Sequence, residues 1–261
     1  LGLHVLSQRK QQSLFDLFEV IKPTNIFVND VLPIQEMNET IQHFKVSYDK
    51  GFRTFKIKSG FPVDHLVKTL KALHQTTEQK CAFRIDANRS WPADQFSDIL
   101  KMLAGFNIEY IEEPQYNPNI QSLKHVIQKS TVPIALDESI NNIDHLKNLL
   151  EVLPEAVIIV KPSILGNIFD LFETLAHHRT HSNRIVVTTA LESSIGRKSI
   201  ASVASIIGAS NMAHGLNTGR FFETDLSHEN LISGGKLKIP TSGFYTIKFD
   251  DLNSGFYQSA D

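Results

Sequence analysis

Phe83-Arg84-Ile85-Asp86-Ala87-Asn88-Arg89-Ser90-Trp91 is the stretch from which the fold can be worked out. Its apolar first half ends in the carboxylate of Asp86, and a helical pattern begins just beyond it at Pro92. Asp86 is therefore expected where a buried strand opens into a loop. Active sites of α/β folds lie at such strand ends.

The same pattern recurs along the chain, because four other apolar runs also end in a charged residue. The terminal residues Lys58, Asp86, Glu112, Asp137 and Lys161 follow one another at steps of 28, 26, 25 and 24 residues. Each step is long enough for one strand and one crossover helix. This spacing predicts an α/β chain folded as a (β/α)8 TIM-type barrel, with these five side chains on one rim.

Eight strands and the helices between them can be placed from hydrophobic periodicity. The strands are predicted at 24–28, 54–58, 82–86, 108–112, 134–137, 156–161, 184–189 and 212–215. Helices are predicted near 36–50, 62–75, 92–103, 120–129, 143–149, 167–178 and 197–207. An amphipathic helix carrying Leu3, Leu6, Leu14, Leu17 and Phe18 is expected before the barrel, and short strands at 237–239 and 245–249 after it.

Composition narrows the class of protein. The 261 residues are 41% hydrophobic and 21% charged, with a net charge of −2, so neither nucleic acid nor an anionic membrane is predicted as a partner. The single cysteine, Cys81, excludes an internal disulfide and fits a reducing compartment. Polar residues 8–12 interrupt the apolar residues among the first twenty, so this stretch does not have the pattern of a signal peptide. No apolar run in the sequence approaches the length of a membrane span. A cytoplasmic enzyme is expected, and the sequence leaves its oligomeric state open.

Asp86, Glu112 and Asp137 would repel one another at neighbouring strand ends, because like charges a few ångströms apart do not all stay ionised. A divalent cation would relieve this repulsion. Ligands that are all oxygen favour Mg²⁺, with Mn²⁺ as the alternative, over Zn²⁺. The competing interpretation is that each carboxylate caps a helix or is a surface charge.

Lys56 and Lys58 are two residues apart on a strand, so their side chains point to the same face. Positive charge nearby would lower the pKa of Lys58 and prepare it as a general base, while Lys161 faces the same volume from the far side of the barrel. The alternative is that both strand lysines are solvated partners of acids. Arg84 also points inward, where it needs a carboxylate from the protein or the substrate.

Six motifs resemble, in order and spacing, the enolase superfamily and its muconate-lactonizing subgroup. They are Lys56-Ile57-Lys58, Asp86-Ala87-Asn88, Ile111-Glu112-Glu113-Pro114, Leu136-Asp137-Glu138-Ser139, Val160-Lys161-Pro162 and Leu191-Glu192-Ser193-Ser194-Ile195-Gly196. Residues 86–91, 192–196 and 214–218 are most similar to the o-succinylbenzoate synthase family. The resemblance implies a (β/α)7β barrel over 24–220, the end of an α+β capping domain over 1–23, and a segment returning to the cap over 221–261.

This resemblance also implies an activity. A carbon-oxygen lyase of this family dehydrates 2-succinyl-6-hydroxy-2,4-cyclohexadiene-1-carboxylate to o-succinylbenzoate in menaquinone biosynthesis, using Mg²⁺. Asp86, Glu112 and Asp137 would hold the metal, Lys58 would act as base and then acid, and Lys161 would stabilise the enediolate. The expected contacts to the small carboxylate substrate are Lys56, Arg84, Asn88, Ser193, Ser194 and Gly215.

Three other functions fit the same residues. The two lysines would also serve an N-acylamino acid racemase or a dipeptide epimerase, although 214–217 lacks the Asp-x-Asp typical of the latter. Lys161 could form a Schiff base, as in class I aldolases. The non-enzymatic alternative is an inactive barrel without its cap.

Overall fold

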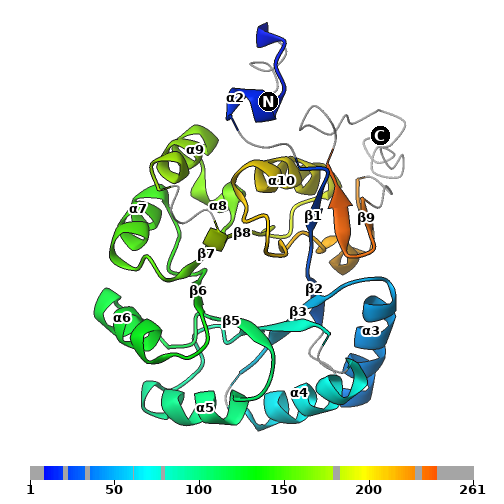
Figure 1. Ribbon diagram of the computed structural model, residues 1–261, viewed down its shortest axis with the longest axis vertical. Helices are drawn as coiled ribbons and strands as arrows, with labels where there is room; N and C mark the ends of the chain where they lie inside the picture. The colour runs from blue at the N-terminus through cyan, green and yellow to red at the C-terminus, as the bar shows by residue number, and fades with distance from the viewer. Residues whose placement is uncertain are drawn as a thin grey trace, which may run out of the picture.

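The chain forms a curled parallel sheet surrounded by helices. The computed structural model describes residues 9–19, 23–32, 36–60, 62–77, 80–178, 183–226 and 231–239. Its seven parallel strands lie side by side in chain order, and Figure 1 shows the helices around the outside of the sheet. The strands are β2 (Asp30–Leu32), β3 (Thr54–Lys58), β4 (Ala82–Asp86), β5 (Ile108–Glu112), β6 (Ile134–Leu136), β7 (Val157–Val160) and β8 (Ile185–Val187). The predicted TIM-type fold is confirmed.

The barrel closes through two isolated bridges rather than a full eighth strand. Val28 bridges to His214, and Thr188 bridges to Gly215. The His214 N–H donates to the Phe27 carbonyl oxygen at 2.8 Å and its carbonyl oxygen accepts the Asn29 N–H at 3.0 Å, which joins this short segment to the residues just before β2. The strand predicted at 212–215 is therefore reduced to its last two residues.

Helices alternate with the strands, as the periodicity predicted. They are α3 (Met37–Asp49), α4 (Asp64–Thr77), α5 (Phe96–Leu103), α6 (Ile120–Lys129), α7 (Ile143–Val152), α8 (Pro162–Leu165), α9 (Ile168–His177) and α10 (Ser194–Ile207). Asn119, Asn142 and Asn167 cap α6, α7 and α9 by accepting backbone N–H groups. The one-turn helix α8 was not predicted. None of the helices in the described ranges is long and apolar enough to cross a membrane.

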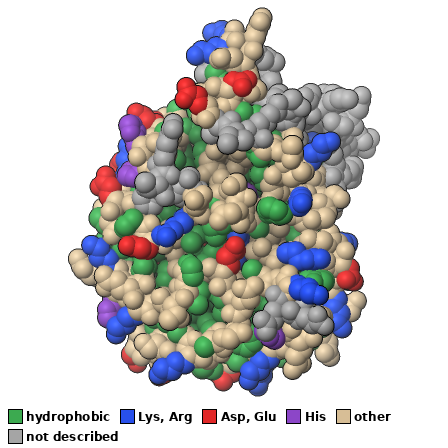
Figure 2. Space-filling view, viewed as in Figure 1, with side chains coloured by type: hydrophobic (Ala, Val, Ile, Leu, Met, Phe, Trp, Pro, Cys, Tyr) green, Lys and Arg blue, Asp and Glu red, His purple; other side chains and the backbone are tan. Residues whose placement is uncertain are grey.

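Two apolar layers hold the barrel together. Outside the sheet, the rings of Phe44 and Phe55 lie 4.5 Å apart between α3 and β3. Inside it, a smaller cluster comprises Tyr110, Ala135, Val157, Ile159, Val186, Ala209 and Met212. Alternate residues of β5 to β8 supply most of this inner cluster, as expected when successive side chains of a barrel strand point in and out. Figure 2 shows acidic and basic side chains interspersed over one face, without a large patch of one sign.

The first predicted strand belongs to a different sheet. Strand β1 (Asn25–Phe27) pairs antiparallel with β10 (Lys236–Lys238), which pairs in turn with β9 (Ile232–Ser233). The sheet of the barrel begins only at β2, which was not predicted separately. The two strands follow one another in an almost continuous extended segment, so local sequence does not reveal where its pairing changes. The strand predicted at 237–239 overlaps β10, and the one at 245–249 lies outside the described residues.

The single amphipathic helix predicted at the start of the chain is wrong for the part that the structure describes. Gln11 has φ of 53°, a left-handed conformation that interrupts a helix. Ser13 then accepts the Asp16 N–H at 3.2 Å and begins the one-turn helix α2 (Leu14–Leu17). Phe18 stacks on Phe172 of α9 at 4.1 Å between ring centroids. Residues 3–8 lie outside the described ranges.

A buried carboxylate joins β2 to its neighbours. Asp30 is 1% exposed and accepts hydrogen bonds from His43 at 2.8 Å, Ser47 at 2.6 Å and Asn217 at 2.9 Å. His43 and Ser47 belong to α3, whereas Asn217 follows the closing segment. Asp30 therefore ties the first strand of the parallel sheet to both ends of the barrel fold.

His214 has a comparable role at the closure. Its ring is buried, its Nδ1 accepts the Val187 N–H at 3.1 Å, and the ring also bonds to the Ala209 backbone. Burial and the charge of Arg84 lower the pKa of His214 from 6.5 to about 3. The folded chain therefore holds this imidazole in its neutral form.

We expect His214 to make the fold sensitive to acid. Below pH 6.5 the unfolded chain binds a proton at His214 that the folded chain does not, so stability falls as the pH drops toward 3. The slope is about 1.4 kcal/mol per pH unit for one proton. Denaturant unfolding at pH 7 and pH 5 should show a smaller loss for His214→Gln than for the unaltered chain. The exposed His125→Gln should keep the full loss, and equal losses in all three chains would contradict this role.

Candidate active site

The five charged side chains predicted on one rim are brought together by the register of the strands. Lys58 pairs with Asp86 across β3 and β4, and Asp86 pairs with Glu112 across β4 and β5. Asp137 and Lys161 directly follow β6 and β7. In a parallel barrel these positions share the C-terminal end, where catalytic side chains lie.

Lysines neutralise the carboxylates in this structure. Lys56 Nζ lies 2.9 Å from Asp86 Oδ2 and 2.8 Å from Glu112 Oε1, and all three side chains are largely buried. Lys161 Nζ lies 2.5 Å from Asp137 Oδ2. Of the two strand lysines, Lys56 pairs with acids, as the alternative interpretation expected. It lies one layer below the rim.

The single ammonium group of Lys56 is shared by two carboxylates, Asp86 and Glu112. Burial opposes the charged form of Lys56, but the carboxylates of Glu112 and Asp86 outweigh it and raise the pKa of Lys56 well above its usual value. Burial also raises the pKa of Glu112, and the charges of Asp86 and Asp137 raise it further, against the opposing effect of Lys56. The same neighbouring charges that favour a proton on Glu112 would favour a further cation beside it.

Lys58 is the least constrained of the rim lysines. It is exposed, and its Nζ lies 3.4 Å from the side-chain oxygen of Asn88. Asn88 donates its side-chain N–H to Glu138 at 3.0 Å. Asn88 and Arg89 have φ of 43° and 58°, conformations that are costly for residues other than glycine. Strained loop conformations of this kind concentrate at functional sites.

The donors at the rim can be compared with what a metal ion requires. Within the described ranges, no three His, Cys, Asp or Glu side chains form a group already arranged to hold one. Glu112 Oε2 is nevertheless buried without a hydrogen-bond partner, which is costly for a carboxylate oxygen. This orphan oxygen, the raised pKa of Glu112 and the all-oxygen donor set fit a hard divalent cation.

Some of the predicted substrate contacts lie at the rim, and others lie buried inside the barrel. Ser193 lies between β8 and α10 and caps α10 by accepting the Gly196 N–H, and Gly215 is the last residue of the closing segment. The Ser194 N–H donates to Asp225 at 2.7 Å. Arg84 is fully buried and donates to Glu109 at 2.6 Å and Asn29 at 3.1 Å. The protein itself therefore supplies the carboxylate that Arg84 needs, and all six substrate contacts stay predictions.

Two buried or half-buried carboxylates were given no role from sequence, Glu113 beside the site and Glu109 toward the opposite end of the barrel. Glu109 reaches Arg84 because the register between β4 and β5 shifts after Phe83, and no sequence pattern signals such a shift. Glu113 is fully buried and bonds to the loop after β6. A signal for Glu113 existed, since a second acid directly follows the predicted metal ligand Glu112.

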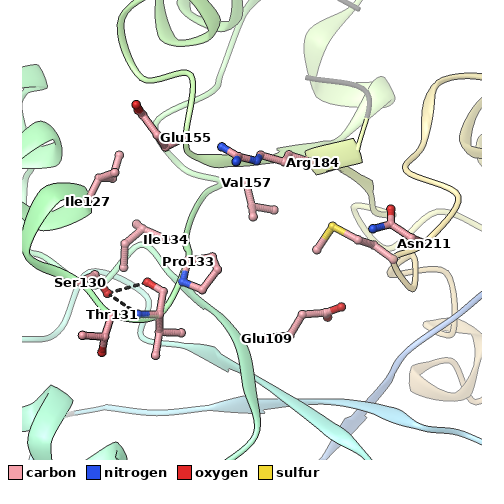
Figure 3. Close-up of a pocket in the computed structure, with 12 residues that line it drawn as sticks. Glu109, Ile127, Ser130, Thr131, Pro133, Ile134, Glu155, Val157, Arg184 and Asn211 are labelled. Carbon is pink, nitrogen blue, oxygen red and sulfur yellow. Dashed lines mark hydrogen bonds between the residues drawn. The ribbon is translucent and has the colours of Figure 1, made fainter. Parts of the chain in front are cut away.

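A cavity of about 490 Å³ lies at the opposite end of the barrel. Its lining includes Ile134 and Val157, the first residues of β6 and β7, and Arg184, which precedes β8. Figure 3 shows Glu155 and Arg184 on one side of it and Glu109 on the other. This cavity is separate from the carboxylate cluster, which occupies the C-terminal strand ends.

Comparison with known proteins identifies the family. Residues 39–244 match the family model described as "Enolase C-terminal domain-like". The chain belongs to the enolase superfamily. This confirms the family suggested by the six motifs.

Two curated relatives show the range of activities in this superfamily. An o-succinylbenzoate synthase of Mycobacterium tuberculosis is 28% identical over 76% of this chain and 57% of its own length. A hydrophobic dipeptide epimerase of Enterococcus faecalis is 26% identical over 80% of this chain and 56% of its own length. The chain thus spans little more than half of these relatives.

Solved structures agree on the fold. The crystal structure of a dipeptide epimerase from Enterococcus faecalis V583 superposes with a TM-score of 0.81 at 22% identity. The match covers 91% of this chain and 70% of that one. At this identity the likeness establishes the shared barrel architecture only.

We expect Lys56→Met to destabilise the metal-free chain by about 3 kcal/mol, because it leaves Asp86 and Glu112 buried beside each other without a counter-charge. Denaturant unfolding in the presence of a chelator measures the change. The matched control is Lys101→Met, which breaks the exposed pair with Asp98 and should have little effect. Similar effects of the two substitutions would contradict the role given to Lys56.

Proposed function

We propose that this chain is a Mg²⁺-dependent hydro-lyase of the o-succinylbenzoate synthase type. It would convert 2-succinyl-6-hydroxy-2,4-cyclohexadiene-1-carboxylate to o-succinylbenzoate in menaquinone biosynthesis. The observation that carries this proposal is the placement of Lys58 at the end of β3 and of Lys161 directly after β7, on opposite sides of the barrel, with the carboxylates between them. The similarity to o-succinylbenzoate synthases supports it.

In this proposal, Lys58 performs both proton transfers. Its amine takes the proton from the carbon next to the substrate carboxylate, and the C–H electron pair delocalises into that carboxylate. The resulting ammonium then gives its proton to the departing hydroxide, which leaves as water. The exposed position of Lys58 leaves its Nζ accessible to a substrate above the rim. One carbon–hydrogen and one carbon–oxygen bond break, and the ring becomes aromatic.

Lys161 and the carboxylates stabilise the charge that develops. Lys161 remains an ammonium and faces the enediolate from the side opposite Lys58. Asp86, Glu112 and Asp137 are proposed to hold Mg²⁺, or Mn²⁺ in its place. The bound ion would supply Lewis-acid stabilisation of the substrate carboxylate. Lys56 would stay paired below these ligands and fix two of them in place.

The remaining predicted contacts belong to the same proposal. Asn88, Ser193, Ser194 and Gly215 would contact the substrate at the rim, while Lys56 and Arg84 would act from the buried layer below it. Residues 1–23 and 221–261 are proposed as parts of a capping region around the barrel of 24–220. We propose a small carboxylate as the substrate, no nucleic-acid or membrane partner, and the cytoplasm as the compartment.

A second candidate function is racemisation or epimerisation of an N-acylated amino acid or a dipeptide. The same placement of Lys58 and Lys161 favours it, because one lysine would remove a proton from one face and the other would return a proton to the opposite face. Relatives named as a dipeptide epimerase and an N-succinyl-L-Arg/Lys racemase make this the principal alternative.

Turnover of the cyclohexadiene substrate with and without Mg²⁺, followed by absorbance of the aromatic product, tests the proposal. We expect metal-dependent turnover that falls by at least about a thousandfold in Lys58→Ala and Lys161→Ala. Lys58→Ala should unfold like the unaltered chain, and Lys161→Ala should still fold although it loses the ion pair with Asp137. The exposed control Lys147→Ala should remain active.

Two outcomes would overturn the assignment. Near-normal dehydration in either lysine variant would refute the role of that lysine. Proton exchange on N-succinyl amino acids, measured in deuterated water without any dehydration, would replace the lyase by the racemase.

A further inference from the structure

Three consecutive loops of the barrel begin at the carboxylates of the candidate site. They follow β4, β5 and β6; Asp86 and Glu112 are the last residues of β4 and β5, and Asp137 is the first residue after β6. Glu113 lies between them. Its side chain is fully buried, yet none of the proposed chemical steps uses it.

Glu113 binds the loop after β6 through two backbone groups. Its Oε1 accepts the Asp137 N–H at 3.1 Å and the Ser139 N–H at 2.8 Å. The first of these donors belongs to a proposed metal ligand. Glu113 therefore fixes the backbone from which the Asp137 carboxylate extends.

The other carboxylate oxygen of Glu113 binds the loop after β4. Glu113 Oε2 accepts Arg89 Nε at 3.1 Å, and Arg89 Nη2 donates to Ser139 Oγ at 3.0 Å. The Arg89 N–H also donates to the Glu113 carbonyl oxygen at 2.7 Å. Arg89, Glu113 and Ser139 thus form a closed set of contacts across all three loops.

This arrangement has an energetic cost that the contacts offset. A buried carboxylate is strongly destabilising unless it is paired and hydrogen-bonded. Glu113 also has φ of 40°, which is unfavourable for a residue with a side chain. The buried carboxylate and the unfavourable φ both occur at a residue that joins three loops of one site. This indicates that the site needs these loops to be held in a fixed arrangement.

We propose that Glu113 is a positioning residue that holds Asp137 in the geometry needed for cation binding. The proposal rests on the metal site proposed above. The contacts of Glu113 with Arg89, Asp137 and Ser139, called the clamp below, do not themselves depend on a cation. Without these hydrogen bonds the loop after β6 would be free to move, and the backbone would no longer hold the Asp137 carboxylate near Glu112. Among the described residues, the Glu113 carboxylate binds Arg89, Asp137 and Ser139, and it acts on the proposed metal site through Asp137.

The first test measures the clamp without metal. Amide hydrogen exchange in the segment containing Asp137 and Ser139 should be about tenfold faster in Glu113→Ala, because two protecting hydrogen bonds are lost. Glu113→Gln keeps one acceptor oxygen for both N–H groups and should restore most of the protection. The exposed Glu151→Ala, in α7, is the matched control and should exchange like the unaltered chain. Equal exchange in Glu113→Ala and the unaltered chain would overturn the proposal.

The second test measures Mn²⁺ affinity by electron paramagnetic resonance. Glu113→Ala should weaken binding at least about tenfold, as is typical when a partner of a metal ligand is removed, and Glu113→Gln should recover most of it. In Asp137→Asn the further change Glu113→Ala should add little, since both act through one ligand. Full additivity, or unchanged affinity in Glu113→Ala, would contradict the proposal.

The two failures can be told apart. If the unaltered chain binds no Mn²⁺, the proposed metal-dependent function fails, and with it the role of Glu113 in cation binding. If the unaltered chain binds Mn²⁺ and Glu113→Ala binds it equally well, only the positioning role fails. Should Glu113→Ala not fold, Asp137 and Ser139 amides that exchange in the unaltered chain as fast as solvent-exposed amides would still refute the clamp.

Discussion

The crowding of negative charge at one end of the barrel is the constraint on which the rest of the site depends. Asp86 and Glu112 occupy paired positions on adjacent strands and are almost fully buried, so at least one cation must accompany them. Lys56 supplies it from two residues before Lys58 on the same face of β3. Because Lys56 pairs with both carboxylates from below, Lys58 is left unpaired with any acid in the described contacts. One ammonium group shared by two carboxylates also leaves room for a further cation at the rim. A single strand thus provides both the structural lysine and the proposed catalytic one.

The closure of the barrel determines whether this geometry can exist. Gly215 permits the close approach of the closing segment to β8, since a Cβ there would lie 2.7 Å from Thr188 Cγ2. Gly208 similarly makes room for the His214 ring, whose Cε1 would lie 2.3 Å from an added Cβ. The neutral, buried His214 then joins the two edges of the sheet. Short bridges thereby replace a full eighth strand and still close the barrel.

Much of this organisation could be predicted from sequence, because parallel strands buried on both faces are continuous apolar runs and their ends carry the functional charges. Asp86, Glu112 and Lys161 could be placed at the rim from this pattern alone. Pairing over long distances could not: nothing local to residues 25–32 shows that β1 joins β10 whereas β2 joins β3. The inward direction of the Glu109 side chain depends on a register shift that the sequence does not reveal. Ser193 caps α10, and the sequence alone does not distinguish a capping serine from one that contacts substrate. Glu113 shows a different gap, since two successive acids were evident and only tertiary contacts assign them different partners.

Every proposed role at the rim depends on the binding of one divalent cation by Asp86, Glu112 and Asp137 in common. Calorimetric titration of the metal-free chain with Mg²⁺ is the decisive experiment, in parallel with Glu112→Gln, which keeps the shape of the side chain and removes its charge. We predict one ion bound per chain, with affinity lost in Glu112→Gln and unchanged in the distant, exposed Glu155→Gln. Absence of binding by the unaltered chain, or equal binding by Glu112→Gln, would contradict a shared metal site.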